Sequence, residues 1–429
     1  MIDRRNFIKL SGGAMAFATL AGCQQQQGGA PVASTTQYSS SDFDAIISRL
    51  NTNSVKWDGR TAVFGTDDVI PLWVADGDFA VANPIQQALL QRAQHPIYGY
   101  TRHPHELRQL LVNWQSQRHG WAIEPDWLVT MPGVVPTLYA AVKALTNEGD
   151  AVIVQPPVYT PFFSAVTDNN RRLLLNPLKN NDGHYEMDFE HLEQCAKQGA
   201  KLLLLCSPHN PIGRVWTRDE LLKLIDISNR YDMTIISDEI HADLVYAPHQ
   251  HIPLLSLDDL SDKLVTIFAP SKTFNMPGLG MAFMVASDPG LRAQLVSEFK
   301  TLHIESNNPF TLTAVQAAYA QGADWVDALL PYLAETQQQV IEFIHQHLPQ
   351  IKVQSSEGTF LMWLDFSSLG LDDKKLHTFL VEQAKVGLSA GISYGKGGEE
   401  FMRLNIAAPR AMVLQALDQI KRAVNKLVL

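Results

Sequence analysis

The sequence predicts an α/β fold, with a large domain built on a mostly parallel sheet and a smaller α/β domain at the C-terminal end. Short apolar runs alternate with amphipathic stretches from about residue 127 to residue 302, as in strands that helices cover on both faces. Beyond about residue 320 the pattern changes to one long amphipathic stretch and fewer apolar runs. The 429 residues are 46% hydrophobic and 18% charged, which is enough apolar material for both domains.

Apolar runs define the expected strands of the large sheet, which are 127–131, 151–155, 172–177, 201–208, 233–238, 263–269 and 280–287. Apolar residues at helical spacing predict helices between them, at 136–147, 188–199, 217–231 and 289–302. The C-terminal part is expected to contain helices at about 325–348 and 373–386 and strands at 358–366 and 399–407. We accordingly expect an N-terminal segment at 42–92 that joins the small domain, a large domain at 93–320 and a small domain at 321–429.

The first 23 residues have the pattern of an export signal. Arg4 and Arg5 precede a short apolar run, which ends in the tetrapeptide "LAGC" at Cys23. This pattern resembles a twin-arginine signal with a lipobox, in which Cys23 is lipidated. Residues 24–41 are polar and are expected to form a flexible linker. We expect a lipoprotein on the periplasmic side of a bacterial membrane, or a cytoplasmic protein if the signal is not processed. A disordered N-terminus with chance arginines is the alternative.

Charge and cysteine content argue against several other classes. The formal net charge is −10 and no basic stripe is present, so nucleic acid is not an expected partner. The 3 cysteines form neither a C-x-x-C motif nor a zinc spacing with histidines, so neither a disulfide scaffold nor a metal site is expected. The "GLSAG" sequence at 387–391 matches the elbow of serine hydrolases, but "ISYGKGGEE" follows it where a helix is required.

Polar or small residues follow the expected strands, where ligands of open α/β sheets bind. They are Gly133, Tyr159, Asn210, Asp238 and Lys272. Taken singly, each has a structural alternative, such as an N-cap at Asp238 or a buried ion pair between Asp238 and Lys272. Taken together they have a chemical meaning. A lysine kept neutral by burial forms a Schiff base with a carbonyl, an aspartate keeps a pyridine nitrogen protonated, and amides at a helix start hold a phosphate. These are the groups that pyridoxal 5'-phosphate requires.

Four separated motifs carry a resemblance to a known family. They are "SPHNPIGRVW", "SDEIHADLVY", "APSKTFNMPGL" and "FMRLNIAAPR". Over about residues 42–429 the sequence resembles fold-type I pyridoxal-phosphate enzymes of the class I/II aminotransferase superfamily. The stretches "PLWVADGDF", "YGYTR" and "SDEIHAD" are similar to the cystathionine β-lyase branch of MalY/PatB type. The resemblance implies a seven-stranded large-domain sheet, the cofactor pyridoxal 5'-phosphate and a homodimer.

The implied activity is that of a carbon–sulfur β-lyase, which converts L-cystathionine or related cysteine S-conjugates to pyruvate, ammonia and a thiol. A class I/II aminotransferase is the alternative, because both reactions begin with the same carbanion. A non-catalytic amino-acid-binding lipoprotein is a more remote alternative, against which the presence of the motif residues argues.

The resemblance also implies roles for individual residues. Lys272 would carry the cofactor and shuttle protons, and Asp238 would pair with the pyridinium nitrogen. Asn210 would hydrogen-bond the ring hydroxyl oxygen, with His241 beside it. Tyr159 would stack on the ring and is counted with Lys272 and Asp238 among the catalytic residues.

Further implied roles concern the phosphate and the substrate. The phosphate would be held by Gly133, Val134, Val135 and Ser271. Tyr100 would reach the phosphate in the partner subunit's site, and Arg403 would bind the substrate α-carboxylate as a bidentate pair.

Three positions depart from the family pattern. Gly77 stands where this branch has methionine, so we expect it to enlarge the substrate pocket and to tune substrate choice. Ile212 replaces a threonine in the Asn-Pro-Thr-Gly loop, and Ala269 replaces a hydroxyl residue three positions before the lysine. Phosphate binding is therefore expected to be weaker.

Overall fold

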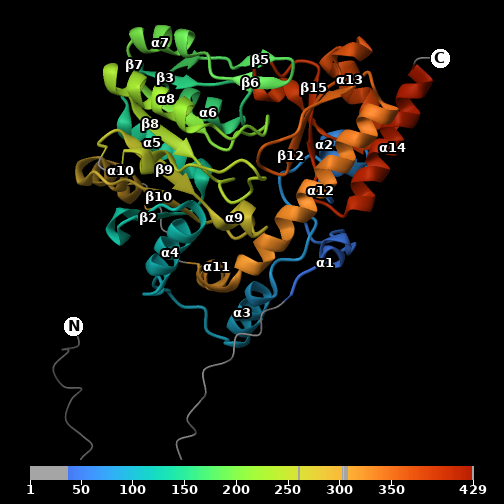
Figure 1. The fold of residues 1–429 in the computed structure, drawn as a ribbon. Coiled ribbons are helices and arrows are strands. Elements are labelled where there is room, and N and C mark those ends of the chain that lie inside the picture. The colour runs from blue at the N-terminus through green and yellow to red at the C-terminus, as the bar shows by residue number, and fades with distance from the viewer. Residues whose placement is uncertain (1–36, 259–260, 302, 304–307, 428–429) are drawn as a thin grey trace, which may run out of the picture. The chain divides into compact units, whose positions relative to one another are not determined.

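The computed structural model describes residues 37–258, 261–301, 303 and 308–427 (Figure 1). The signal segment with Cys23 and residues 24–36 of the expected linker lie outside these ranges, so the predictions made for them remain predictions. In the described ranges we find no helix with the length and apolarity that crossing a membrane requires. The described residues belong to one compact unit, and the predicted domain limits also remain predictions.

A seven-stranded sheet occupies the middle of the chain, as the sequence predicted (Figure 1). Its strands are β2 (Leu128–Met131), β3 (Ala151–Val154), β4 (Arg172–Leu175), β7 (Ala200–Cys206), β8 (Thr234–Asp238), β9 (Leu264–Phe268) and β10 (Ala282–Val285). The order is β2-β10-β9-β8-β7-β3-β4, and all neighbours are parallel except β10, which is antiparallel to both β2 and β9. The expected fold class is confirmed.

Helices bury both faces of this sheet. They include α5 (Val134–Leu145), α6 (Pro161–Thr167), α7 (Phe189–Lys197), α8 (Arg218–Arg230) and α10 (Pro289–Thr301). In β7, Leu203 and Leu205 pack into one core while Leu202 and Leu204 pack into the other. Because side chains alternate between the two faces of a strand, burial of both faces requires the continuous apolar runs seen in the sequence.

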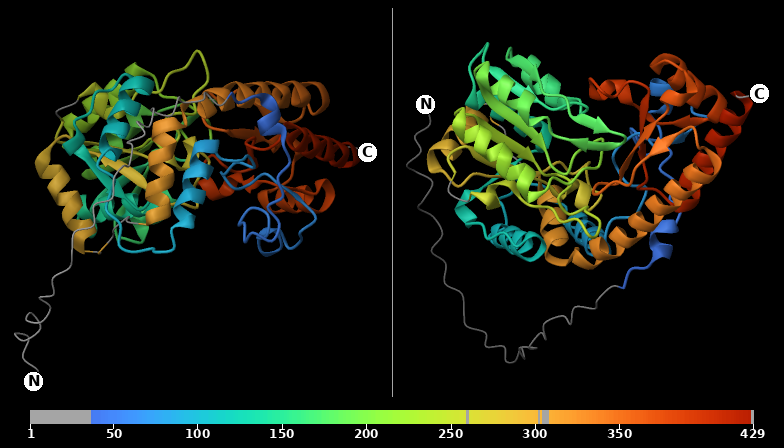
Figure 2. Two further views of the ribbon diagram at one scale, coloured as in Figure 1. Left: turned by 90° about the horizontal axis from the view of Figure 1, so that it is seen from below. Right: turned by 45° about the horizontal axis from the view of Figure 1, so that its top comes forward.

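A second, four-stranded antiparallel sheet follows near the C-terminus, in the order β11-β12-β15-β14. Its strands are β11 (Lys352–Val353), β12 (Leu361–Asp365), β14 (Ser389–Ala390) and β15 (Phe401–Asn405), and its helices include α12 (Ala323–His347), α13 (Asp373–Phe379) and α14 (Arg410–Leu427). The long α12 runs from α11 (Pro309–Gln321) to this sheet (Figure 1 and Figure 2). The predicted helix at 373–386 is shorter, because a π-helical turn (Leu380–Ala384) follows α13 and Lys385 then takes a φ of 56°.

The N-terminal part of the described chain contains α1 (Ser40–Asp44), α2 (Arg60–Phe64), β1 (Ile70–Pro71), α3 (Asn83–Gln94) and α4 (Leu107–His119). Of these helices, α1 packs against α12, whereas α3 and α4 pack against α11. β1 pairs in parallel with β13 (Val386–Gly387), and Tyr332 of α12 donates a hydrogen bond to Asp44 at 2.6 Å. The segment that follows β1 thereby reaches the carboxyl ends of the large-sheet strands.

Candidate active site

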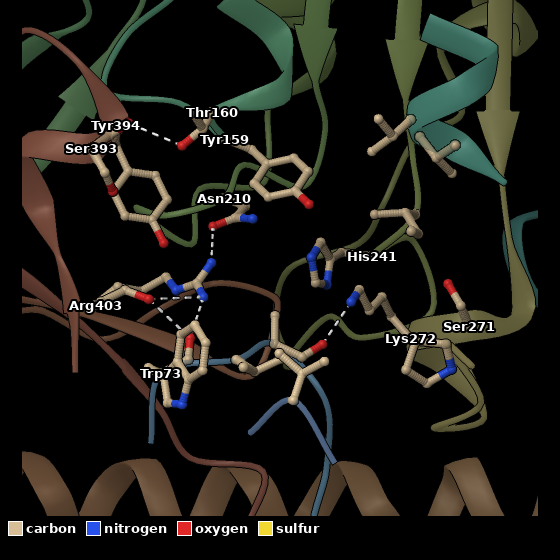
Figure 3. Close-up of a pocket in the computed structure, with 18 of the residues that line it drawn as sticks. Trp73, Tyr159, Thr160, Asn210, His241, Ser271, Lys272, Ser393, Tyr394 and Arg403 are labelled. Atoms are coloured by element: carbon tan, nitrogen blue, oxygen red, sulfur yellow. Dashed lines mark hydrogen bonds between the residues drawn. The ribbon is translucent and has the colours of Figure 1, made fainter. Parts of the chain in front are cut away.

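A cavity of about 760 Å³ lies at the carboxyl ends of the large-sheet strands (Figure 3). Ten of the predicted site residues line it, namely Gly133, Val134, Val135, Tyr159, Asn210, Asp238, His241, Ser271, Lys272 and Arg403. These residues come from the carboxyl ends of five strands of the large sheet, or from loops and helix starts that follow them, and, for Arg403, from β15 of the second sheet. The strand-end argument gave five of these residues, and the family resemblance gave the other five.

Lys272 lies in α9 (Pro270–Thr273), the short helix that begins just after β9. Its Nζ donates a hydrogen bond at 2.6 Å to the carbonyl oxygen of Ala75, in the segment that follows β1 (Figure 3). Burial and the positive charge of Arg403 lower the pKa of Lys272 to about 8, although Asp76 and Asp238 oppose the shift. The amine therefore loses its proton far more readily than an exposed lysine does.

Asp238 ends β8 and is buried, with 4% of its surface exposed. Burial raises the pKa of its carboxyl to about 7. The backbone NH of Ile240, which donates to Oδ1 at 3.1 Å, acts in the opposite direction and lowers this pKa. A buried carboxylate is costly unless a cation or several donors meet it. A protonated ring nitrogen would supply that cation, so Asp238 fits the cofactor predicted from the sequence.

Arg403 reaches the cavity from β15 with 4% of its surface exposed. It donates to Oδ1 of Asn210 at 3.0 Å, to the carbonyl oxygen of Trp73 at 2.6 Å and to Oγ of Ser389 at 3.4 Å (Figure 3). Its guanidinium also lies 5.3 Å from the centre of the Tyr394 ring. None of these partners is a carboxylate, and a buried guanidinium is well suited to bind one.

The Nε atom of Arg403 is buried and has no hydrogen-bond partner among the described residues. His241 is in the same state at Nδ1 and is 1% exposed. Burial holds the pKa of His241 well below its usual range, and the charges of Lys272 and Arg403 add to the effect. Unsatisfied buried polar atoms in one cavity indicate a polar ligand that completes their hydrogen bonds.

The start of α5 provides the expected phosphate seat. Gly133 is its N-cap residue and Val134 its first helical residue, so the free amides of the first turn face the cavity that Ser271 also lines. Tyr159 lies on the opposite side of Asn210 from Arg403 in Figure 3, and burial raises the pKa of its hydroxyl, which therefore stays protonated.

Two predicted site residues do not line the cavity. Gly77 is buried against Asn275, to which its NH donates at 2.8 Å, and a Cβ at this position would lie 3.1 Å from the Asn275 side chain. Tyr100 is fully exposed in the single chain. The predicted contact of Tyr100 with a partner subunit's site remains a prediction.

The two residues whose departure from the family pattern was expected to weaken phosphate binding lie in the core. Ile212 is buried beside the loop that holds Asn210, and Ala269 is the buried N-cap residue of α9. Neither residue lines the large cavity.

Sequence reasoning missed the cavity wall that residues 73–75 provide. Trp73 and Ala75 contribute backbone carbonyl oxygens to Arg403 and Lys272. A backbone carbonyl is present in every residue, so no sequence signal marks these two. The contact between Thr160 and the carbonyl oxygen of Ser393, at 3.0 Å, was missed for the same reason.

Comparison with known families matches residues 71–420 to the family described as "Aminotransferase class I and II". The chain belongs to this family. Among its curated relatives, cystathionine beta-lyase PatB of Bacillus subtilis is 42% identical over 386 residues, which cover 90% of this chain and 100% of the relative. The family resemblance drawn from the motifs is confirmed.

Two solved structures resemble this member of the family closely. The PLP-bound putative aminotransferase from Clostridium difficile has a TM-score of 0.88 and 42% identity, and the match covers 90% of this chain and 100% of that chain. Cystalysin from Treponema denticola, whose structure contains a pyridoxal 5'-phosphate cofactor, has a TM-score of 0.87 and 35% identity. That match covers 90% of this chain and 99% of that chain.

Proposed function

We propose that the protein is a pyridoxal-phosphate-dependent carbon–sulfur β-lyase, which acts on L-cystathionine or related cysteine S-conjugates. The observation that carries this proposal is the convergence of Lys272, with its lowered pKa, and the buried guanidinium of Arg403 on one cavity. Relatives described as cystathionine beta-lyases, at 42% identity in the case of PatB, support the same reaction.

The cofactor pyridoxal 5'-phosphate, when bound, supplies an electron sink for the carbanion formed at the substrate Cα. Lys272 would hold it covalently and Asp238 would pair with its ring nitrogen. Asn210 would donate to the ring oxygen from its amide nitrogen, while its Oδ1 accepts from Arg403. The first amides of α5 and the hydroxyl of Ser271 would hold the phosphate.

The chain's own residues then account for the reaction. Arg403 would bind the α-carboxylate of the amino acid, and Nζ of Lys272, freed when the substrate amine takes its place on the cofactor, would remove the proton from Cα. The bond between Cβ and sulfur breaks, the electron pair leaves on sulfur, and the thiolate takes up a proton. Water hydrolyses the remaining aminoacrylate to pyruvate and ammonia, so one thiol, one pyruvate and one ammonia leave for each substrate and water consumed.

An aminotransferase is the second candidate, because the family and the Clostridium difficile structure carry that description. A substrate panel separates the two functions. We expect pyruvate, ammonia and thiol to be released in equal amounts from cystathionine or other cysteine S-conjugates. Amino transfer to a keto acid that greatly outpaces pyruvate release would instead establish the aminotransferase.

We propose further that the enzyme is a homodimer in which Tyr100 of each chain completes the partner's phosphate seat. The full exposure of this aromatic side chain in the single chain supports the idea. Tyr100→Phe should leave the dimer intact in sedimentation experiments and weaken cofactor binding. Unchanged cofactor affinity would show that the hydroxyl of Tyr100 does not contact the cofactor phosphate.

The proposed location, a lipid-anchored protein exported by the twin-arginine route, rests on Arg4 and Arg5, the short apolar run after them and the "LAGC" sequence that ends at Cys23. Cells expressing the intact gene should contain the protein in the membrane fraction, with lipid on Cys23. An Arg4→Lys, Arg5→Lys variant should stay in the cytosol. If both proteins are cytosolic and unprocessed, export is excluded while the enzymatic proposal stands.

A further inference from the structure

Part of the cavity lining consists of apolar side chains to which no role has been assigned so far. They belong to Val55, Val63, Phe64, Trp73 and Leu388, and we call these five residues the apolar wall. The rings of Phe64 and Trp73 meet edge to face at 5.7 Å. Phe64 also packs with Val69 and Val381 in a small core against which Trp73 lies, so these two aromatic residues of the wall are held in place before any ligand binds.

The apolar wall adjoins the groups that hold the reacting atoms. The carbonyl oxygen of Trp73 accepts from Arg403 at 2.6 Å, and that of Ala75, two residues on, accepts from Lys272 at 2.6 Å. An amino acid bound between Arg403 and Lys272 therefore lies along the segment that begins with Trp73. Its carboxylate and its α-proton face these two residues, which leaves the sulfur substituent to extend along the wall.

The charged side chains that line the cavity are Asp238, Lys272 and Arg403. The proposed function uses all three, for the ring nitrogen, the α-proton and the α-carboxylate. The apolar wall itself contains no charged side chain, and the titratable group next to it is His377, whose ring stacks on Phe64 at 5.9 Å. The distal ammonium and carboxylate of cystathionine would thus lose water without gaining an ionic partner from the lining that this chain provides, which is unfavourable.

We propose that the apolar wall is the subsite for the sulfur substituent and selects uncharged alkyl or aryl S-conjugates of cysteine over cystathionine. This inference rests on the proposed lyase function and names its substrate class. An aryl group fits the chemistry of the wall, since it can pack against Phe64 and Trp73 and carries no charge that needs a partner.

The test compares S-benzyl-L-cysteine with L-cystathionine as substrates of the full-length holoenzyme, with pyruvate release as the readout. We expect kcat/KM to favour the S-benzyl substrate by at least about tenfold. Val63→Lys places a cation on the apolar wall at a side chain that is 46% exposed and therefore tolerant of substitution. It should lower kcat/KM for the S-benzyl substrate and raise it for cystathionine.

Leu222→Lys is the matched control, because Leu222 is 39% exposed on α8 and does not line the cavity. In this variant the ratio of kcat/KM for S-benzyl-L-cysteine to kcat/KM for L-cystathionine should equal that of the unchanged enzyme. The visible absorbance of bound cofactor checks that each variant is folded and loaded.

A binding measurement separates selection from cleavage. The carbon analogues 2-amino-5-phenylpentanoate and 2,7-diaminosuberate lack the scissile sulfur, and their binding can be followed through the cofactor absorbance. The phenyl analogue should bind more tightly than 2,7-diaminosuberate. Val63→Lys should reduce the difference between the two affinities.

Each outcome has one meaning. Equal or better use of cystathionine, or a ratio that Val63→Lys leaves unchanged, overturns the assignment of the wall and leaves the lyase function standing. Absence of pyruvate from both substrates overturns the lyase function itself.

Discussion

The Nζ atom of Lys272 bonds to a backbone carbonyl rather than to a carboxylate, and this partner leaves the amine free to lose its proton. We predict that Lys272→Ala abolishes the absorbance of lysine-bound cofactor and lowers turnover by at least about 10²–10⁴-fold, the usual contribution of a general base. Lys263→Ala is the control, since Lys263 pairs with Asp232 at the surface. Borohydride reduction and peptide mapping locate the cofactor, and a pyridoxyl group on another lysine would refute the assignment.

Asp238 should make the stability of the cofactor-free protein depend on pH. Its carboxyl ionises near 3.8 when unfolded, but burial raises its pKa to about 7 in the folded protein. The folded state therefore holds an extra proton between these values, and its free energy of unfolding should fall as pH rises from about 4 to about 7, by up to about 4 kcal/mol.

Asp238→Asn removes this titration and should flatten that part of the profile. Urea unfolding of both cofactor-free proteins between pH 4 and 8 measures the difference. Parallel profiles would show that the carboxyl is not held uncharged in the folded protein.

Gly133, Tyr159, Asn210, Asp238 and Lys272 were predictable because they lie at the ends of apolar strands, and parallel strands bring their carboxyl ends to one edge. Arg403 comes from another sheet, and only the family resemblance indicated it. Gly77 shows the limit of such reasoning. Its place in a family motif suggested contact with the substrate, but the structure packs it against Asn275, 198 positions away. A contact between residues so far apart depends on the complete fold, which periodicity does not determine.

At the scale of elements, α9 is too short to be stable alone, since one helical turn does not repay the cost of its nucleation. Asp243 fixes it by accepting hydrogen bonds from Thr273 at 2.7 Å, from Trp114 at 3.0 Å and from His119 at 2.9 Å. Because Thr273 follows Lys272 directly, this carboxylate also sets the position of the lysine.

We predict that Thr273→Val, which keeps the shape and removes the hydroxyl, destabilises the protein by about 1–3 kcal/mol and weakens cofactor binding. Thr273→Ser keeps the hydroxyl donor and should retain most of the stability and most of the cofactor affinity. Urea unfolding and cofactor titration provide the measurements. If Val and Ser behave alike, the hydroxyl does not hold α9.

The helices and strands themselves were largely predictable, and the exception near residue 380 has a physical reason. An amphipathic pattern continues through Leu380–Ala384 whether the turn is α or π, so the sequence suggested one helix to about 386. The structure instead places Val386 and Gly387 in β13, where they pair with β1 from the other end of the chain. A local sequence pattern does not identify a pairing partner that lies so far away in the sequence.

At the scale of the whole molecule, a buried ionic cluster fastens the N-terminal part of the described chain. Lys56 is fully buried and meets Asp78 at 2.6 Å, while Arg49 bonds to Asp76 and Asp78, each at 2.7 Å. The cluster holds the chain next to Ala75, and therefore also positions the carbonyl that receives Lys272.

We predict that Lys56→Met destabilises the protein by about 3–5 kcal/mol, because it leaves buried carboxylates short of a cation. Lys375→Met is the matched control, since Lys375 and Asp372 form an exposed pair that should contribute about 0–1 kcal/mol. Urea unfolding compares the two. Equal losses in the free energy of unfolding would show that the buried ion pairs of Lys56 contribute no more to stability than the exposed pair of Lys375.

Trp73 and Arg403 meet in the cavity although 330 positions separate them in the chain. Chains grow at about 5–20 residues per second, so roughly 15–65 s pass between the synthesis of these two residues. Asp238 and then Lys272 are synthesised during that interval, while Arg403, which would bind the substrate carboxylate, is still absent. The residues that would hold the cofactor are thus synthesised before Arg403, so the cavity can bind a substrate carboxylate only after residue 403 has been added to the chain.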